Sequence, residues 1–145
     1  MSIKIVGVGK SFGDFVALEG IDLDIATGEL TALLGPSGGG KSTLLRIIAG
    51  LEVADSGSVE IEGVDATGLP AQKRNVGFVF QHYAAFRHLT VAGNVGFGLK
   101  VRKRPRKEIA ARVNELLELV HLSQFANRLP AQLSGGQRQR MALAR

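Results

Sequence analysis

Apolar and polar side chains alternate along the first part of the chain. Between residues 21 and 25, every second residue is Ile or Leu and each residue between them is Asp. Successive side chains of a strand lie on opposite faces, so this pattern indicates a strand with one buried face. It predicts two strands, residues 3–12 and 16–25, and the alternation in residues 58–63 predicts a further antiparallel strand.

Two other runs, residues 30–34 and 76–80, are apolar without alternation. Strands covered on both faces have this pattern, which is common in parallel sheets, and we expect both runs to be buried strands. In residues 108–120 the apolar positions fall on one helical face, which predicts an amphipathic helix. Ser134 is a predicted N-cap for another helix that runs to Arg145. Strands and helices mixed in this order predict an α/β fold.

A glycine-rich loop joins the run at 30–34 to a predicted helix over residues 44–50. Its spacing, Gly, four residues, then Gly-Lys-Ser, is typical of a phosphate-binding loop. Glycines let the backbone turn several N–H groups into one concavity, and the helix that starts near Lys41 adds the positive end of its dipole. Lys41 can reach the β- and γ-phosphates of a nucleotide, and the Ser42 hydroxyl can ligate Mg²⁺. The flanking strand and helix disfavour the alternative, a turn that binds nothing. The candidate residues are Gly35, Pro36, Ser37, Gly38, Gly39, Gly40, Lys41, Ser42 and Thr43.

Composition limits the classes of protein to consider. The 145 residues suffice for one domain with a hydrophobic core. There is no Cys, which excludes disulfides and fits a cytosolic protein, and no apolar run is as long as a membrane-spanning helix. The net charge is +5, with much of the excess in residues 100–107. That run could meet nucleic acid or anionic lipid, but a solvated loop before a helix is the simpler interpretation, and no aromatic residue interleaves with its charges.

Two further features lie where ligands commonly bind. Gln81 follows the apolar run at 76–80, and open α/β sheets place their ligands at the carboxyl ends of such strands. Ser134, Gly135 and Gly136 begin a predicted helix, whose first N–H groups can bind an anion. Taken alone, the second feature fits an ordinary capped helix equally well.

In combination, these features resemble the ATP-binding subunit of ABC transporters over essentially the whole chain. The loop at 35–42, Gln81, and Leu-Ser-Gly-Gly-Gln at 133–137 follow one another in the order of that family. The resemblance implies a P-loop NTPase core with an antiparallel β subdomain and a helical subdomain. It also implies that ATP and Mg²⁺ are the cofactors.

The resemblance divides the chain and assigns roles to its residues. Residues 1–81 would hold the core and the β subdomain, residues 82–132 the helical subdomain, and residues 133–145 the signature and the start of the following helix. Phe12 matches the aromatic residue that stacks on adenine. Gln81 matches the glutamine that senses Mg²⁺ and the attacking water, so that Lys41 and Gln81 are the implied catalytic residues and Ser42 and Gln81 the implied Mg²⁺ ligands. Ser134, Gly135, Gly136 and Gln137 match the signature that contacts the γ-phosphate of ATP held by the opposite subunit.

The family also implies partners and a location. Two copies would sandwich two nucleotides, and residues 82–132 would dock on membrane-spanning permease subunits, with a periplasmic binding protein as an indirect partner and no nucleic acid. The chain would lie peripherally on the cytoplasmic face of the inner membrane. Residues 81–91 and 130–133 are similar to ATPases of sulfate/thiosulfate importers, and importers of maltose, polyamines and iron share much of both stretches. We therefore expect ATP-driven sulfate or thiosulfate uptake, with another imported solute as the alternative.

The family continues past the signature helix with a buried strand that ends in Asp-Glu, called Walker B, and then a histidine switch. We expect this chain to be an N-terminal fragment truncated before the Walker B strand. Without that strand, backbone N–H and C=O groups of the central sheet would lack partners, so we expect marginal stability or aggregation. A second alternative function follows, namely a fragment that binds nucleotide but does not hydrolyse it.

Overall fold

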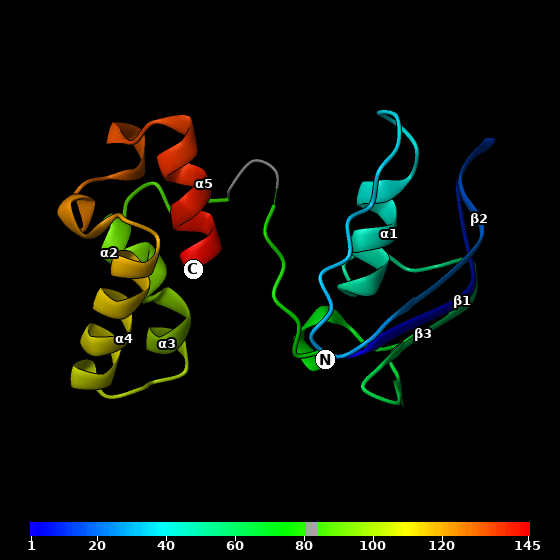
Figure 1. The fold of residues 1–145 in the computed structure, drawn as a ribbon, viewed down its shortest axis with the longest axis horizontal. Coiled ribbons are helices and arrows are strands. Elements are labelled where there is room, and N and C mark those ends of the chain that lie inside the picture. The colour runs from blue at the N-terminus through cyan, green and yellow to red at the C-terminus, as the bar shows by residue number, and fades with distance from the viewer. Residues whose placement is uncertain (81–83) are drawn as a thin grey trace. The chain divides into compact units, whose positions relative to one another are not determined.

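The computed structural model describes residues 1–80 and 84–145. They form two compact units, Met1–Phe78 and Val79–Arg145 (Figure 1). Each unit has its own cluster of buried apolar side chains. Gln81, one of the predicted site residues, lies outside the described residues.

The first unit is built on an antiparallel sheet. Its strands are β1 (Ile3–Phe12), β2 (Phe15–Ile25), β3 (Ser56–Ile61) and β4 (Val64–Asp65), in the order β2-β1-β3-β4. Strand β1 is central and pairs with β2 on one side and β3 on the other. The three strands predicted from alternation are therefore present, and the third begins and ends two residues earlier than expected.

Helix α1 (Lys41–Ile48) packs against this sheet and completes the first core. The helix contributes Leu44, Ile47 and Ile48, which are buried because their spacing places them on one helical face. The sheet contributes Ile5, Val8, Leu18, Val59 and Ile61. The core thus fixes the helix that begins at the glycine-rich loop.

Residues 30–34 and 76–80, which we expected to be buried strands, are not strands in the structure. Neither run takes part in the described sheet, and the side chains of Leu30 and Leu34 are 97% and 91% exposed. Leu33 does pack against the core, so exposure alternates along the first run. The prediction was wrong because an apolar run becomes a strand only in a ladder with another strand, and none of the strands in the described residues pairs with either run.

Arg74 ties helix α1 to the segment after β4. Its Nη1 donates to the carbonyl oxygens of Ile47 and Ile48 at 2.8 and 3.1 Å. Its Nε donates to Leu69 O at 2.7 Å and its Nη2 to Thr67 O at 3.1 Å. The residue is buried, which lowers the pKa of the guanidinium from its usual value. A cation at the carboxyl end of a helix also interacts favourably with the helix dipole.

The second unit is helical. It contains α2 (Val91–Val95), α3 (Phe97–Val101), α4 (Arg106–Leu119) and α5 (Gly135–Ala144), with short 3₁₀ turns at Ser123–Phe125 and Pro130–Gln132. Its buried core includes Val91, Val95, Val113, Leu117, Leu122 and Met141. The predicted amphipathic helix is α4, which begins two residues earlier than expected and ends one residue earlier. Within the described residues, no helix is long and apolar enough to cross a membrane.

The entry into this helical unit is fixed by Asn94, whose side chain is fully buried. Its Oδ1 accepts from the Phe86 N–H at 2.8 Å. Its Nδ2 donates to the carbonyl oxygens of Phe86, Leu89 and Thr90 at 3.0–3.1 Å. One buried side chain therefore satisfies four polar backbone groups of residues 86–90, and these bonds also supply the partners that its own buried amide needs.

Candidate nucleotide-binding site

The glycine-rich loop leads into the amino-terminal end of α1, at the top of the first unit in Figure 1. Gly40 is the N-cap of the helix and has φ 75°, in the left-handed region. A Cβ at this position would lie 2.3 Å from the main-chain oxygen of Ala17 and 2.6 Å from Leu18 Cδ2. Because only glycine fits both the φ value and the space, Gly40 lets the loop lie directly against β2.

Lys41 holds the loop closed. Its Nζ donates to the carbonyl oxygens of Gly35 at 2.8 Å and Pro36 at 2.6 Å, and the Gly39 N–H donates to Pro36 O at 3.2 Å. Both hydrogen bonds of the ammonium group are exposed to solvent. The loop is therefore preformed, with a cation held by two of its carbonyl oxygens.

The start of α1 offers further groups to an anion. No side chain caps the helix and its first turn contains no acidic residue, so its N–H groups keep their positive potential. Ser37 and Ser42 are exposed, and Thr43 is half-buried. This donor set of N–H groups, an ammonium and hydroxyls fits a polyphosphate, and the Ser42 hydroxyl is of the type that ligates phosphate-bound Mg²⁺.

Phe12 lies at the end of β1 and pairs with Phe15 across the hairpin turn. Phe12 is 47% exposed, so that part of it is open to a planar ligand. Lys10 Nζ lies 5.3 Å from the ring centroid, a cation–π contact. Lys10 was not among the residues predicted from the sequence. Because residues two apart on a strand share a face, its spacing to Phe12 could have predicted that the two side chains lie together.

Lys10 is held in place by two carboxylates. Its Nζ lies 2.9 Å from Asp55 Oδ1 and 3.3 Å from Glu52 Oε1. The hydrogen bond to Asp55 raises the pKa of Lys10. The Ser11 N–H, which donates to Asp55 Oδ2 at 2.7 Å, and then Lys10 lower the pKa of Asp55. Lys10 is therefore a fixed positive charge beside the ring.

The predicted signature lies at the start of α5 in the second unit. Ser134 is the N-cap, as expected: its Oγ accepts from the Gln137 N–H at 3.3 Å, and Gln137 Oε1 accepts from the Ser134 N–H at 2.7 Å. A Cβ added at Gly135 or Gly136 would meet nothing within 4 Å. The capping hydroxyl uses a lone pair, so its proton is still available to donate.

The structure thus brings the loop residues, Lys41 and Ser42 together at one helix start, with Phe12 in the same unit. The signature residues 134–137 gather at another helix start in the other unit. Among the described residues, no three acidic or histidine side chains converge on a possible metal site. The geometry thus offers two helix starts whose first N–H groups can receive an anion, one of them at the glycine-rich loop.

Comparison with known proteins identifies the class. Residues 18–145 match the family model of the ABC transporter, so the chain belongs to the ABC transporter ATPase family. Two solved structures of MJ0796, a bacterial ABC transporter cassette, align with 98% of the chain at 36% identity, with TM-scores of 0.88 and 0.87, and the chain covers 67% of each. One is described as dimeric, and the other as dimeric and bound to ADP and Pi. The fold expected from the sequence is confirmed.

Individual relatives are more similar still. The sulfate/thiosulfate import ATP-binding protein CysA of Gloeobacter violaceus is 66% identical over all 145 residues. The protein of the same name from Mycobacterium bovis is 62% identical over 144 residues. The chain spans about two fifths of the length of these relatives, 42% and 41% respectively.

Proposed function

We propose that this chain carries the ATP-binding part of an ATPase subunit that drives import of sulfate or thiosulfate. The observation that carries the proposal is the identity of 62–66% to sulfate/thiosulfate import proteins along essentially the entire chain, the helical unit included. In the resemblance described above, the helical unit is the part that meets the permease. Similarity in this unit therefore bears on the transported solute more directly than similarity in the loop does.

In this proposal ATP is bound by the glycine-rich loop. The N–H groups of the loop and of α1 hold its phosphates, and Lys41 turns from the loop carbonyls to the β- and γ-phosphates. Mg²⁺, when bound, neutralises phosphate charge. Its proposed protein ligands are Ser42, which lies in the described part of the chain, and Gln81, which does not. Lys41 and Gln81 are the proposed catalytic residues, Lys41 by neutralising charge on the transferring phosphoryl group and Gln81 by positioning water.

The proposed site is completed by a second copy of the chain. Ser134, Gly135, Gly136 and Gln137 at the start of α5 would contact the γ-phosphate of ATP held by the other copy. The dimeric MJ0796 cassette supports this arrangement. The membrane-spanning permease, a periplasmic binding protein reached through it, and a peripheral position on the cytoplasmic face of the inner membrane complete the proposal.

Phe12 gives a test of base recognition. Replacing Phe12 with Ala is expected to weaken ATP binding about tenfold, because stacking of a base on an aromatic ring contributes about 1–3 kcal/mol. Binding of inorganic triphosphate should not change, since it has no base. Titration calorimetry with both ligands measures the two effects separately.

The matched control is Phe15→Ala, because Phe15 is the strand partner of Phe12 and is also exposed. This variant should bind ATP like the unmodified chain. Equal losses in the two variants would instead indicate that the hairpin as a whole is disturbed. Loss of triphosphate binding in Phe12→Ala would contradict a base-stacking function.

The transport function is tested by exchange of segments. The matching segment of the Gloeobacter violaceus relative is replaced with this chain, and the chimaera is produced in cells that lack their own sulfate importer ATPase. We expect uptake of labelled sulfate to be restored, and Lys41→Ala in the chimaera to abolish it. A chimaera that hydrolyses ATP but supports no sulfate or thiosulfate uptake would refute the proposed solute, whereas one that binds no ATP would refute the proposed site.

A further inference from the structure

The turn between α3 and α4 is strongly positive. Six of the eight residues from 100 to 107, which span the end of α3, the turn and the start of α4, are basic, and we call them the basic end: Lys100, Arg102, Lys103, Arg104, Arg106 and Lys107. All six are exposed. Within the described residues only Arg104 has an ion-pair partner, Glu108 at 3.2 Å. Five positive charges are therefore not neutralised by neighbouring carboxylates.

The stability of the helical unit does not account for this charge. Arg106 and Lys107 occupy the first turn of α4, where positive charge is unfavourable because the helix dipole has its positive end there. Lys103 adopts φ 55°, a left-handed conformation that Gly or Asn would adopt more easily. A bound anion would reduce the repulsion among these cations. It would also interact favourably with the positive end of the α4 dipole.

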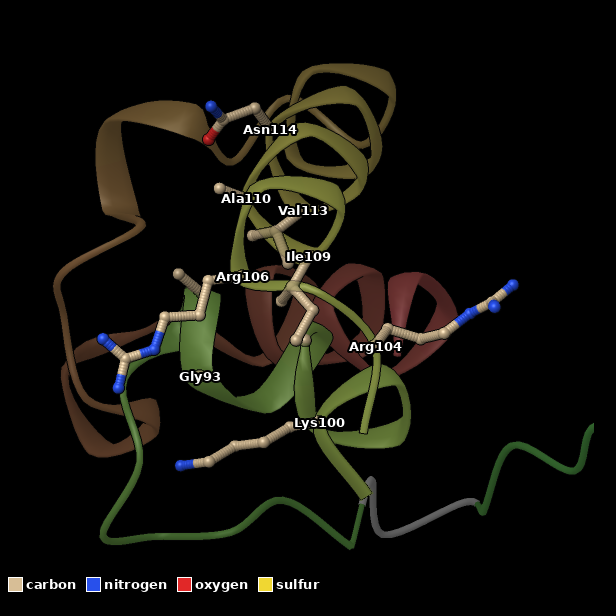
Figure 2. Close-up of a pocket in the computed structure, with 10 residues that line it drawn as sticks. Gly93, Lys100, Arg104, Arg106, Ile109, Ala110, Val113 and Asn114 are labelled. Atoms are coloured by element: carbon tan, nitrogen blue, oxygen red, sulfur yellow. The ribbon is translucent and has the colours of Figure 1, made fainter. Parts of the chain in front are cut away.

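An open groove of about 540 Å³ lies beside the basic end. Its apolar lining comes from α2, α4 and the junction to α3, and consists of Ala92, Gly93, Gly96, Ile109, Ala110 and Val113. Figure 2 shows the side chains of Lys100 and Arg106 extending to the same side of the groove, while Arg104 points away. The surface thus combines cations with apolar atoms, which suits a ligand that is anionic at one end and apolar at the other.

We propose that the basic end binds anionic phospholipid headgroups at a membrane surface. Its charges follow the whole turn instead of converging on one point, as expected for contact with an extended anionic surface. Val101, 63% exposed between the cations, would gain by entering the lipid interface. Single-stranded nucleic acid is disfavoured because residues 100–107 contain no aromatic side chain to stack on a base, and duplex DNA is left to the test below.

Lipid binding at the basic end does not involve the nucleotide loop. It goes beyond the proposed ATPase function, and either can fail while the other holds. Each Lys or Arg near an anionic surface contributes about fivefold to the partition coefficient. Removing four of the cations should therefore reduce binding by well over tenfold.

The test is flotation of the 145-residue chain with lipid vesicles, which separates bound protein from any aggregate because aggregates sink. Phosphatidylcholine vesicles that contain about 30% phosphatidylglycerol should carry the chain upward, and vesicles of phosphatidylcholine alone should not. Binding should be lost when NaCl is raised from about 0.05 M to about 0.3 M, since screening shortens the reach of the charges. Equal flotation with both vesicle types would overturn the proposal.

Two variants with equal net charge locate the surface. The first combines Arg102→Gln, Lys103→Asn, Arg106→Gln and Lys107→Gln, with Asn chosen for the left-handed position. The control combines Lys4→Gln, Arg46→Gln, Lys73→Gln and Arg87→Gln, all exposed residues outside the basic end. Circular dichroism verifies that both are folded.

We expect the first variant to lose vesicle binding and the control to lose much less. Equal losses would mean that net charge alone attracts the chain, which contradicts a defined surface. Tighter binding to double-stranded DNA than to the anionic vesicles, with the loss again confined to the first variant, would replace the lipid with a nucleic acid and refute the proposal. If the first variant does not fold, the single changes Arg102→Gln and Lys4→Gln are compared in place of the two sets, with the larger loss again expected at Arg102.

Discussion

Alanine in place of Lys41 is expected to lower the affinity of the chain for ATP by about 100-fold, because each hydrogen bond from a charged group contributes about 1.5–3 kcal/mol. In the structure the ammonium already donates to Gly35 O and Pro36 O, so it is positioned within the loop before any phosphate arrives. Binding then requires it only to exchange carbonyl oxygens for phosphate oxygens. Alanine removes the cation and leaves the phosphates facing N–H groups alone.

Fluorescence of a labelled ATP analogue measures this loss. The control is Arg46→Ala on the same helix, an exposed residue that takes no part in the loop and should leave affinity unchanged. Hydrogen exchange of the α1 amides tests whether Lys41→Ala keeps the helix folded. Undiminished affinity in a folded Lys41→Ala chain would refute the nucleotide site.

The largest expected effect on stability is that of Arg74→Met, a loss of about 3 kcal/mol or more from the first unit. Methionine keeps much of the buried volume but donates no hydrogen bond. The substitution would leave Ile47 O and Ile48 O, at the end of α1, without the guanidinium, and would do the same to Leu69 O and Thr67 O. Ile47 O would keep the Gly50 N–H at 3.1 Å, but each of the other carbonyls that loses its partner costs about 1–3 kcal/mol, less where water can enter.

Hydrogen exchange of amides in β1 and α1 reports on this unit alone, which matters because the chain has two units. The control is Lys73→Met, an adjacent exposed cation, which should be nearly neutral. Arg74→Lys should be intermediate, since an ammonium cannot reach four carbonyls in the geometry of a planar guanidinium. Equal protection in Arg74→Met and the unmodified chain would show that the four hydrogen bonds do not stabilise the unit.

Features that depend on local pattern could be predicted from the sequence. The alternation in residues 21–25 set the faces of that part of β2, and the Gly-Lys-Ser spacing located the start of α1. Ser134 was recognisable as an N-cap because capping needs only the residues that follow it. Each of these features is decided within a few neighbouring residues.

Features that depend on distant parts of the chain could not be predicted. Arg74 lies in a polar stretch that resembles a solvated connector, and its burial is set by carbonyls up to 27 residues away. Asn94 has no local signal for a buried amide, because its contacts arise from the path of the preceding turn. The apolar runs at 30–34 and 76–80 indicate that these side chains favour burial. Whether either run forms a strand depends on which other strand lies beside it, and the run itself does not specify that strand.

The capping of α5 limits which residues position 134 can tolerate. The Ser134 hydroxyl accepts the Gln137 N–H and, in the proposed site, donates its proton to a phosphate. Alanine would lose both contacts, and aspartate would keep the cap but oppose the phosphate charge. Threonine alone among the alternatives retains a hydroxyl of the same reach. We therefore expect sequence variation at this position to be confined to hydroxyl residues, a restriction imposed jointly by helix formation and by ligand charge.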